Sequence, residues 1–156
     1  MQLTRFTDYA LRVIMHLAAS NGALMSTREI AAIHNAKYNH LAKVTQWLAA
    51  EGYLETVRGR AGGIALSRKP EDICIGTLVR QLESQSVLVE CMREDGGECR
   101  LAPACGLAVI LKEAEESFFQ TLDKMTLADV LSRQRGLFDL LIDMNSEKQI
   151  HINGLR

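Results

Sequence analysis

Three cysteines, Cys91, Cys99 and Cys105, lie in one stretch of the sequence and have side chains that could together hold a metal centre. Thiolates are soft ligands that favour zinc, cuprous copper or an iron-sulfur cluster. Structural zinc sites usually contain close pairs of ligands, whereas seven residues separate the first two cysteines here and five separate the last two. Such wide intervals, with Gly96 and Gly97 inside the first, predict a loop whose amides can hydrogen-bond to sulfide. Zinc remains the competitor of an iron-sulfur cluster.

A centre held by three thiolates needs a further ligand from elsewhere, because no histidine lies between Cys91 and Cys105. Cys74, an acidic residue or a small exogenous ligand could supply it. We expect Cys74 to belong to the core, since it falls in the apolar stretch 72–83. Cys105 directly precedes a predicted helix, where the partial positive charge of the helix end stabilises a thiolate and an anionic cluster.

The segments around the cysteines predict an irregular loop followed by a long helix. Residues 84–105 lose hydrophobic periodicity and contain two adjacent glycines and a proline. Beyond them, one helical stripe is apolar at Leu107, Ile110, Leu111, Ala114, Phe118 and Leu122. Such a helix suits a dimer interface, although packing within the same chain is the alternative. We expect a dimerisation helix and a C-terminal helical segment at 106–145, and a flexible tail at 146–156.

The N-terminal part, residues 1–83, predicts a domain that begins with three helices. Apolar residues recur at helical spacing from 7 to about 20, and Asn21-Gly22 ends that helix. Ser26 and Glu29 form the pattern of a capping box, which starts a short helix to about position 34. Asn39 is the expected cap of a third helix to about position 51, with its apolar stripe at Leu41, Val44, Trp47 and Leu48. Two short helices separated by a tight turn predict a helix-turn-helix, whose second helix enters the major groove of DNA.

A β-hairpin is predicted directly after these helices. The run 53–57 is rich in β-branched and aromatic residues, the next six residues form a glycine-rich turn, and positions 64–66 alternate back. Arg58 and Arg60 lie at the tip, with Arg68 and Lys69 just beyond. A cationic hairpin beside a recognition helix can contact phosphate or the minor groove, although a hairpin with two arginines could also be only a soluble turn. The predicted fold is therefore mainly α with a small β-hairpin: a winged helix-turn-helix domain plus a long dimerisation helix.

The residues that we expect to contact double-stranded DNA come from three segments of this domain. On the third helix, His40, Lys43, Thr45 and Gln46 are expected to point outward, although they could merely be a solvated face. The full set of predicted DNA contacts is Ser26, Thr27, Arg28, Tyr38, Asn39, His40, Lys43, Gln46, Arg58 and Arg60.

Composition and charge are consistent with this prediction. The chain has 156 residues, 47% hydrophobic and 24% charged, and no apolar run is long enough to cross a membrane. Residues 1–70 contain nine Lys or Arg against four Asp or Glu, whereas the remainder contains nine against fifteen. A basic N-terminal half predicts a polyanionic partner. The N-terminus lacks the continuous apolar stretch of a secretory signal, so we expect a cytoplasmic protein. In that reducing compartment, cysteines bind metal more often than they form disulfides.

Other classes of protein fit the sequence less well. The four histidines, His16, His34, His40 and His151, form no catalytic motif, so we do not expect an enzyme. A zinc-stabilised DNA-binding protein that senses nothing, or an electron carrier, would also be compatible with the cysteines.

Three motifs carry a resemblance to a known family. The opening LTRFTDYALRV, the hairpin RGRAGGIAL and the pattern C-x7-C-x5-C occur in this order between residue 1 and about 133. Together they resemble the iron-sulfur winged-helix repressor family of the NsrR, IscR and RirA type. The start of the recognition helix at Asn39-His40-Leu41, and Pro103-Ala104-Cys105 leading into TLADV at 126–130, look most like the nitric-oxide-sensitive members.

The resemblance implies a regulatory function and a further cluster ligand, neither of which the residues alone indicate. It implies a homodimeric repressor that binds its operator while a 4Fe-4S or 2Fe-2S cluster is intact and releases it when nitric oxide destroys the cluster. It also implies a further ligand from the N-terminal region of the other subunit, where Asp8 stands, although Asp8 could simply interact with its helix dipole. Ala108 occupies the position of a histidine ligand in the IscR type. Regulation by iron or by redox state is the alternative within the family.

Overall fold

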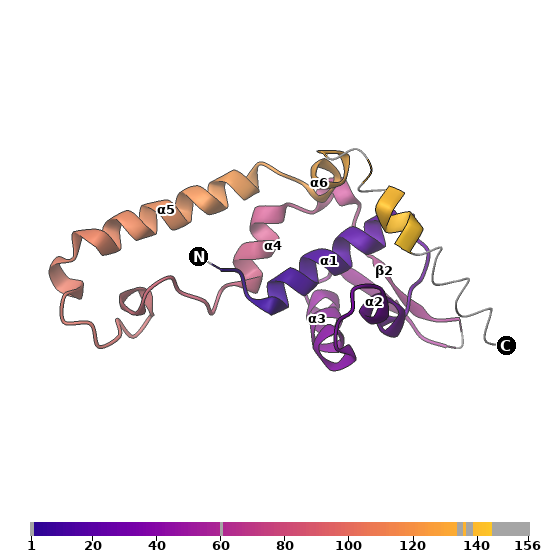
Figure 1. Cartoon of the computed structure of the whole chain (residues 1–156), viewed down its shortest axis with the longest axis horizontal. Helices are drawn as coiled ribbons and strands as arrows, with labels where there is room; N and C mark the ends of the chain where they lie inside the picture. The colour runs from indigo at the N-terminus through magenta and orange to yellow at the C-terminus, as the bar shows by residue number, and fades with distance from the viewer. Residues whose placement is uncertain (1, 60, 134–135, 137–138, 145–156) are drawn as a thin grey trace.

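The computed structural model describes residues 2–59, 61–133, 136 and 139–144, and it has a mainly helical body with one β-hairpin and one projecting helix (Figure 1). The body contains α1 (Arg5–Ala19), α2 (Thr27–Ile33), α3 (Tyr38–Ala50), β1 (Leu54–Val57), β2 (Gly63–Leu66), α4 (Ile75–Leu82) and α6 (Leu127–Arg133). The projecting helix is α5 (Gly106–Asp123). No helix in the described part of the chain has the length and apolar character needed to span a membrane. The predicted class, mainly α with a small hairpin, is confirmed.

Side-chain caps fix the starts of α1 and α2. Thr4 accepts a hydrogen bond from the Thr7 amide, and α1 then buries the face that contains Val13, Ile14 and Leu17. The capping box of α2 is present in full, because Ser26 accepts from the Glu29 amide while Glu29 accepts from the Ser26 amide. These two helices follow the prediction closely.

The start of α3 differs from the prediction. Asn39 does not cap the helix, because α3 begins at Tyr38 and the capping position is Lys37, whose side chain makes no capping hydrogen bond. The Lys37 carbonyl accepts hydrogen bonds from the amides of His40 and Leu41. Asn39 therefore lies inside the first turn of the helix and not at its capping position. Leu41, Val44 and Leu48 are buried as expected, whereas Trp47 is half-buried.

The hairpin is the predicted wing, and its second strand is attached to the segment before α2. β1 and β2 pair antiparallel, with Leu54 opposite Leu66 and Val57 opposite Gly63. On its other side Ile64 exchanges backbone hydrogen bonds with Met25, at 2.8 and 3.1 Å. A Cβ atom on Gly63 would lie about 2.9 Å from the Met25 backbone, so only glycine allows this close approach. The wing is therefore fixed directly to the helix-turn-helix.

The long helix leaves the body and the chain then returns to it. The segment 84–105 and α5 extend away from α1 to α4, and α6 lies back against the body (Figure 1). Leu127 is fully buried in the same core as Ile73 and Leu78, and its amide donates to the Ile73 carbonyl. The core of the body, which we call the reading domain because it contains the predicted helix-turn-helix and wing, therefore includes residues from both sides of α5.

Cys74 lies at this junction and not in the core. It is half-buried at the N-cap of α4, and it forms an isolated β-bridge with Thr126. Its thiol donates to the Asp123 carbonyl at 3.5 Å. The prediction that Cys74 belongs to the core is wrong, because α4 starts one residue later and its buried face begins at Ile75.

Candidate DNA interface and cysteine loop

The outer face of α3 presents a row of exposed polar side chains. Tyr38, Asn39, His40, Lys43 and Gln46 are all exposed, whereas the opposite side of α3 is part of the core. This arrangement follows from the helical period, because apolar residues take the inner positions and leave this face outside. A face of this kind offers hydrogen-bond donors and acceptors to base edges and phosphates.

The predicted contacts on α2 divide into one outward side chain and two that have structural roles. Arg28 is exposed, and its guanidinium lies 5.5 Å from the centre of the Tyr38 ring, which joins the starts of α2 and α3. Ser26 is occupied by the capping box. Thr27 is half-buried, with its hydroxyl 3.4 Å from the hydroxyl of Thr45.

Thr45 was expected to point outward, and that expectation is wrong. Its side chain is buried and donates a hydrogen bond to the Ala42 carbonyl at 3.1 Å. A threonine inside a helix commonly bonds back to the preceding turn, and here the facing hydroxyl on α2 makes burial possible.

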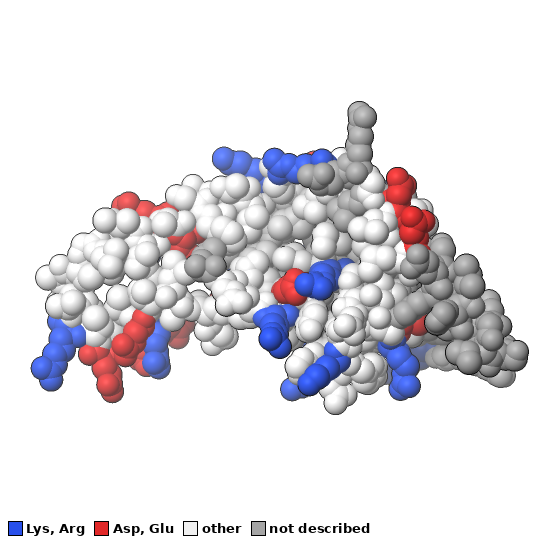
Figure 2. Space-filling model, in the orientation of Figure 1, with Lys and Arg blue, Asp and Glu red and all other residues white. Residues whose placement is uncertain are grey.

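The wing carries one described cation at its tip. Arg58 is exposed at the end of β1, whereas Arg60, the other predicted contact, lies outside the described residues. Arg68 donates to the carbonyls of Glu51 and Gly52, and its guanidinium lies 4.4 Å from the centre of the Tyr53 ring. It therefore stabilises the C-terminal end of α3. Lys and Arg side chains lie along the lower edge of the body, below α2 and α3, and others lie along its upper edge (Figure 2).

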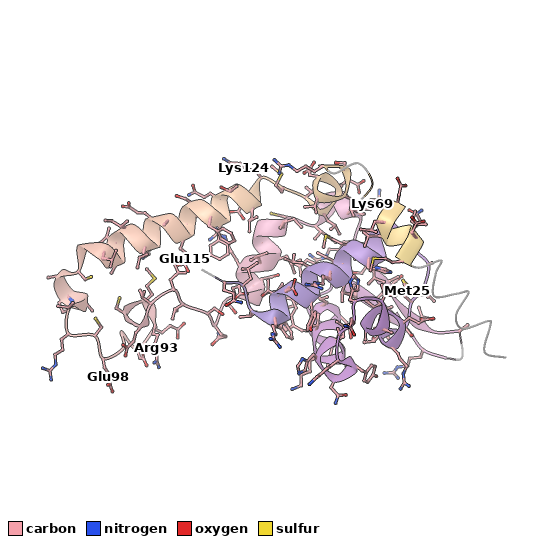
Figure 3. The ribbon with its side chains drawn as sticks, viewed as in Figure 1. Met25, Lys69, Arg93, Glu98, Glu115 and Lys124 are labelled. Atoms are coloured by element: carbon pink, nitrogen blue, oxygen red, sulfur yellow. The ribbon has the colours of Figure 1, made fainter. Side chains whose placement is uncertain are left out.

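The interval between Cys91 and Cys99 is closed by a hydrogen bond. The carboxylate of Glu90 accepts from the Glu98 amide at 3.0 Å, so the residues directly before the two cysteines are in contact. Gly96 and Gly97 turn the chain with φ angles of +74° and +60°, values that favour glycine. A Cβ atom on Gly97 would meet the Glu90 side chain. This segment, which contains the labelled Arg93 and Glu98, lies beneath α5 in the view of Figure 3.

The cysteines have the donor chemistry for a cluster, although their thiols are not gathered into a ligand set. Cys91, Cys99 and Cys105 are half-buried and form no disulfide. Among the described residues, no three His, Cys, Asp or Glu side chains converge on a position that could hold a metal ion. Apart from two short 3-10 turns, residues 84–105 are irregular, so no helix or strand holds the cysteines apart. Three free thiols in such a loop fit an iron-sulfur cluster in their chemistry, and the cluster would need one further ligand from elsewhere.

Asp8 lies in the first turn of α1 and is paired within its own chain. Its two carboxylate oxygens contact the Arg12 guanidinium at 3.0 and 2.8 Å, and both side chains are partly exposed. Pairing one turn apart along a helix is a common surface interaction and contributes about 0.3–0.5 kcal/mol. The carboxylate is thus accessible from outside the chain.

A buried carboxylate joins the start of α1 to the start of the cysteine loop. Glu83, the residue before the loop, accepts from the Thr4 amide at 2.8 Å and from the hydroxyls of Thr4 and Thr7. Burial opposes ionisation, but hydrogen bonds from Thr7, Ser86 and Thr4 outweigh it, so the pKa of Glu83 lies below its usual value. Sequence reasoning missed this residue.

A second group of charges joins α4 to α5. Arg80 donates to Glu116 at 3.0 Å and to Asp123 at 2.9 Å, and it stacks on the Phe119 ring at 4.4 Å. The hydrogen bonds to Glu116 and Asp123 raise the pKa of Arg80. The hydrogen bond from Arg80 in turn holds the pKa of Glu116 below its usual value. At the helix crossing, a Cβ atom on Gly76 would collide with the Asp123 backbone. The C-terminal half of α5 is thus fixed to the body.

The N-terminal half of α5 has an exposed apolar face. No residue of α5, all of which is described, is buried. Leu107 and Ile110 on the apolar stripe are 61% and 62% exposed, and Val109, on another side of the helix, is 59% exposed. Monomeric proteins rarely expose several large apolar side chains together. Packing within the same chain, which was the alternative to a dimer interface, therefore involves only the C-terminal part of this stripe, at Phe118 and Leu122.

Sequence comparison relates the chain to known regulators over nearly its whole length. Residues 3–133 match the profile of the Rrf2 family, described as an iron-dependent transcriptional regulator. The chain is 43% identical to the HTH-type transcriptional regulator NsrR of Halalkalibacterium halodurans over 90% of this chain and 97% of that protein. It is 44% identical to the regulator of the same name from Geobacillus kaustophilus, with the same coverage of both chains.

Solved structures of similar shape come from the same group of regulators. The global cysteine regulator CymR of B. subtilis superposes with a TM-score of 0.63 at 26% identity, over 86% of this chain and 98% of that one. T. potens IscR superposes with a TM-score of 0.66 at 24% identity, over 85% and 88% of the two chains, and supports the fold. These relatives are transcription regulators and not enzymes. With its helix-turn-helix, its wing and its long projecting helix, the chain belongs to the Rrf2 family of transcriptional regulators.

Proposed function

We propose that this transcriptional regulator is a homodimeric repressor whose operator binding is controlled by an iron-sulfur cluster, with nitric oxide as the signal. The observation that carries the proposal is the position of the three cysteines, in an irregular loop directly between α4 of the reading domain and the exposed apolar start of α5. The similarity to regulators named NsrR supports nitric oxide as the signal over iron or redox state.

Cys91, Cys99 and Cys105 are the residues that would hold the cluster, of 4Fe-4S or 2Fe-2S type. When bound, the cluster would supply iron that reacts with nitric oxide. Glu90 supports ligation by Cys91 and Cys99, because its hydrogen bond to the Glu98 amide keeps the two ends of their interval together. Cys105 is the N-cap of α5, where the partial positive charge of the helix end favours an anionic cluster.

The exposed face of α5 would form the dimer interface. Leu107 and Ile110 would be covered by the same surface of a second copy, since a two-fold axis pairs each patch with itself. A dimer has two recognition helices, one for each of two operator half-sites. The body contributes the remaining predicted DNA contacts, Arg28 on α2, the outer face of α3 and Arg58 on the wing.

Asp8 of the partner subunit is our proposed further ligand. Its carboxylate is accessible, and in the isolated chain its only described ion pair is with Arg12. Ligation across the dimer would connect the cysteine loop of one subunit to α1 of the other. Release of that connection would then change the spacing of the recognition helices and lower the affinity for two half-sites together.

The experiment is an anaerobic titration with nitric oxide that follows visible absorbance and operator binding in the same samples. We expect brown protein whose visible absorbance and DNA affinity fall with the same stoichiometry. A colourless protein that contains zinc and binds DNA regardless of nitric oxide would contradict the proposal. Loss of binding on iron chelation but not with nitric oxide would assign the signal to iron.

A further inference from the structure

A small groove lies between the start of α1 and the first half of α3, at the edge of the candidate DNA interface. Its volume is about 150 Å³, and it is lined by Arg5, Phe6, Tyr9, His40, Lys43 and Val44. Two of the predicted DNA contacts on α3, His40 and Lys43, therefore form one wall. The opposite wall comes from α1, where sequence reasoning assigned no DNA contact. The groove thus continues the surface of the recognition helix onto a second helix.

The charges around this groove are all of one sign. Arg5 and Lys43 are exposed cations that approach from different helices, and none of the described residues that line the groove is a carboxylate. The nearest acidic side chain along α1, Asp8, is occupied by Arg12. The remaining lining residues include Phe6, Tyr9 and Val44, whose rings and methyl groups give the groove an apolar surface. A cationic rim over an apolar floor complements a sugar-phosphate unit, whose phosphate is anionic and whose deoxyribose ring is largely apolar.

The start of α1 is held firmly in this position. Thr4 caps the helix through its hydroxyl, and both the amide and the hydroxyl of Thr4 also donate to the buried Glu83. Phe6 packs edge-on against Trp47 of α3, with ring centres 6.2 Å apart. Arg5 is therefore presented from a fixed backbone beside α3, which reduces the entropy lost when it binds.

We propose that Arg5 and Lys43 together bind one phosphate of the DNA backbone beside the bases read by α3, with the adjoining sugar against Phe6 and Tyr9. This inference rests on the proposed role of α3 in the major groove. In helix-turn-helix proteins the helix before the recognition helix crosses the DNA backbone, and here α1 provides an additional contact of that kind. The contact is independent of sequence and fixes the orientation of α3.

The test is the salt dependence of DNA binding by the anaerobically purified chain, with Arg5→Ala compared with the unsubstituted chain. Two short duplexes serve as probes: one selected from a random-sequence pool by the unsubstituted chain, and a scrambled one of equal composition. Loss of one phosphate contact in each subunit of the proposed dimer should weaken binding to both about thirtyfold at 0.15 M salt and reduce the slope of log K against log salt by about 1.8. Arg5→Lys should retain most of the slope.

Lys124→Ala is the matched control, because it removes one exposed cation from the edge of the molecule opposite α3 (Figure 3). Its slope should equal that of the unsubstituted chain. An unchanged slope for Arg5→Ala would overturn the inference, as would weaker binding to the selected duplex alone. If Arg58→Ala lowers the slope while Arg5→Ala does not, only this inference fails. If no duplex can be selected at all, the proposed DNA-reading function itself fails.

Discussion

At the scale of single residues, the three loop cysteines differ from Cys74 in their surroundings. Cys91, Cys99 and Cys105 share the irregular segment 84–105, whereas the Cys74 thiol is bonded to the Asp123 carbonyl at the α4–α5 junction. We therefore expect Cys91→Ser, Cys99→Ser and Cys105→Ser each to abolish iron binding, and Cys74→Ser to retain it. Metal analysis and visible absorbance of anaerobically purified variants measure this. Equal iron loss in Cys74→Ser would make that residue a ligand.

Glu83 provides a prediction about stability and pH. Because its pKa is lower in the folded chain than in the unfolded one, its contribution is present above the ordinary glutamate pKa of about 4.3 and is lost as pH falls through the lower, folded value. Glu83→Gln removes the charge that the Thr4 and Thr7 hydroxyls donate to, and should cost about 1–3 kcal/mol at neutral pH.

Urea unfolding of Glu83→Gln and of the unsubstituted chain, at pH 7 and in the acid range below pH 4.3, measures this contribution. The difference between the two should shrink as the pH falls. Glu55→Gln is the control, since it makes the same change on an exposed side chain of β1 and should have little effect at either pH. A difference that is constant with pH would show that the Glu83 charge contributes nothing.

At the scale of elements, the wing is positioned by its backbone bonds to the segment before α2. Ile64 exchanges hydrogen bonds with Met25, so the exposed Arg58 is carried on a hairpin that is fixed to the helix-turn-helix. We expect Arg58→Ala to weaken binding to all DNA sequences and to reduce the salt slope by about 2, about 1 for each subunit of the proposed dimer, because a wing arginine mainly neutralises phosphate. Lys112→Ala on α5 should leave the slope unchanged. A slope unaltered by Arg58→Ala would remove the wing from the interface.

Local sequence patterns predicted most of these elements. The capping box at Ser26, the glycine-rich turn after β1 and the apolar stripe of α5 depend on neighbouring residues, which a single sequence displays. The misplaced cap at Asn39 is also local, and there the closure of the first turn by the Lys37 carbonyl decided the start of α3.

The features that sequence reasoning missed depend on residues far apart in the chain. Glu83 and Thr4 are 79 positions apart, and Arg80 bonds to carboxylates 36 and 43 positions away. No periodicity marks such pairs, because an acidic residue at a helix end resembles any solvated one. The burial of Thr45 likewise follows from a hydroxyl on a different helix. A buried or helix-bridging charge becomes visible only when the packing of α1, α4 and α5 is known.

At the scale of the whole molecule, the exposed face of α5 predicts that the chain is a dimer. Ile110→Glu would place an unpaired charge in the proposed interface, and should raise the dimer dissociation constant by at least about a hundredfold. Sedimentation measures the oligomeric state, and operator affinity should fall in the same variant because only one half-site is engaged. Leu24→Glu makes a similar apolar-to-acid change at an exposed position on the body and should remain dimeric. A dimeric Ile110→Glu would exclude this face.

Asp8 predicts how the cysteine loop and the operator are coupled across that dimer. Asp8→Ala should retain the cysteine-bound iron but leave DNA affinity insensitive to its loss. Arg12→Ala is the matched control, because it breaks the same ion pair and keeps the carboxylate. Operator titrations on the iron-loaded and iron-free forms of both variants, at equal salt, measure the coupling. If the unsubstituted chain binds the operator equally tightly with and without iron, the coupling mechanism is wrong.

The return of α6 to the body has a consequence for how the protein is made. Leu127 completes a core whose other fully buried members come from residues before α5, so the reading domain is not contiguous in the chain. A ribosome synthesises this chain in order, and α1 to α4 cannot bury their full core until α6 has emerged. By that time the cysteine loop and α5 have already been synthesised. Every nascent chain that reaches the finished DNA-reading fold therefore already contains the segment through which we propose that it is controlled.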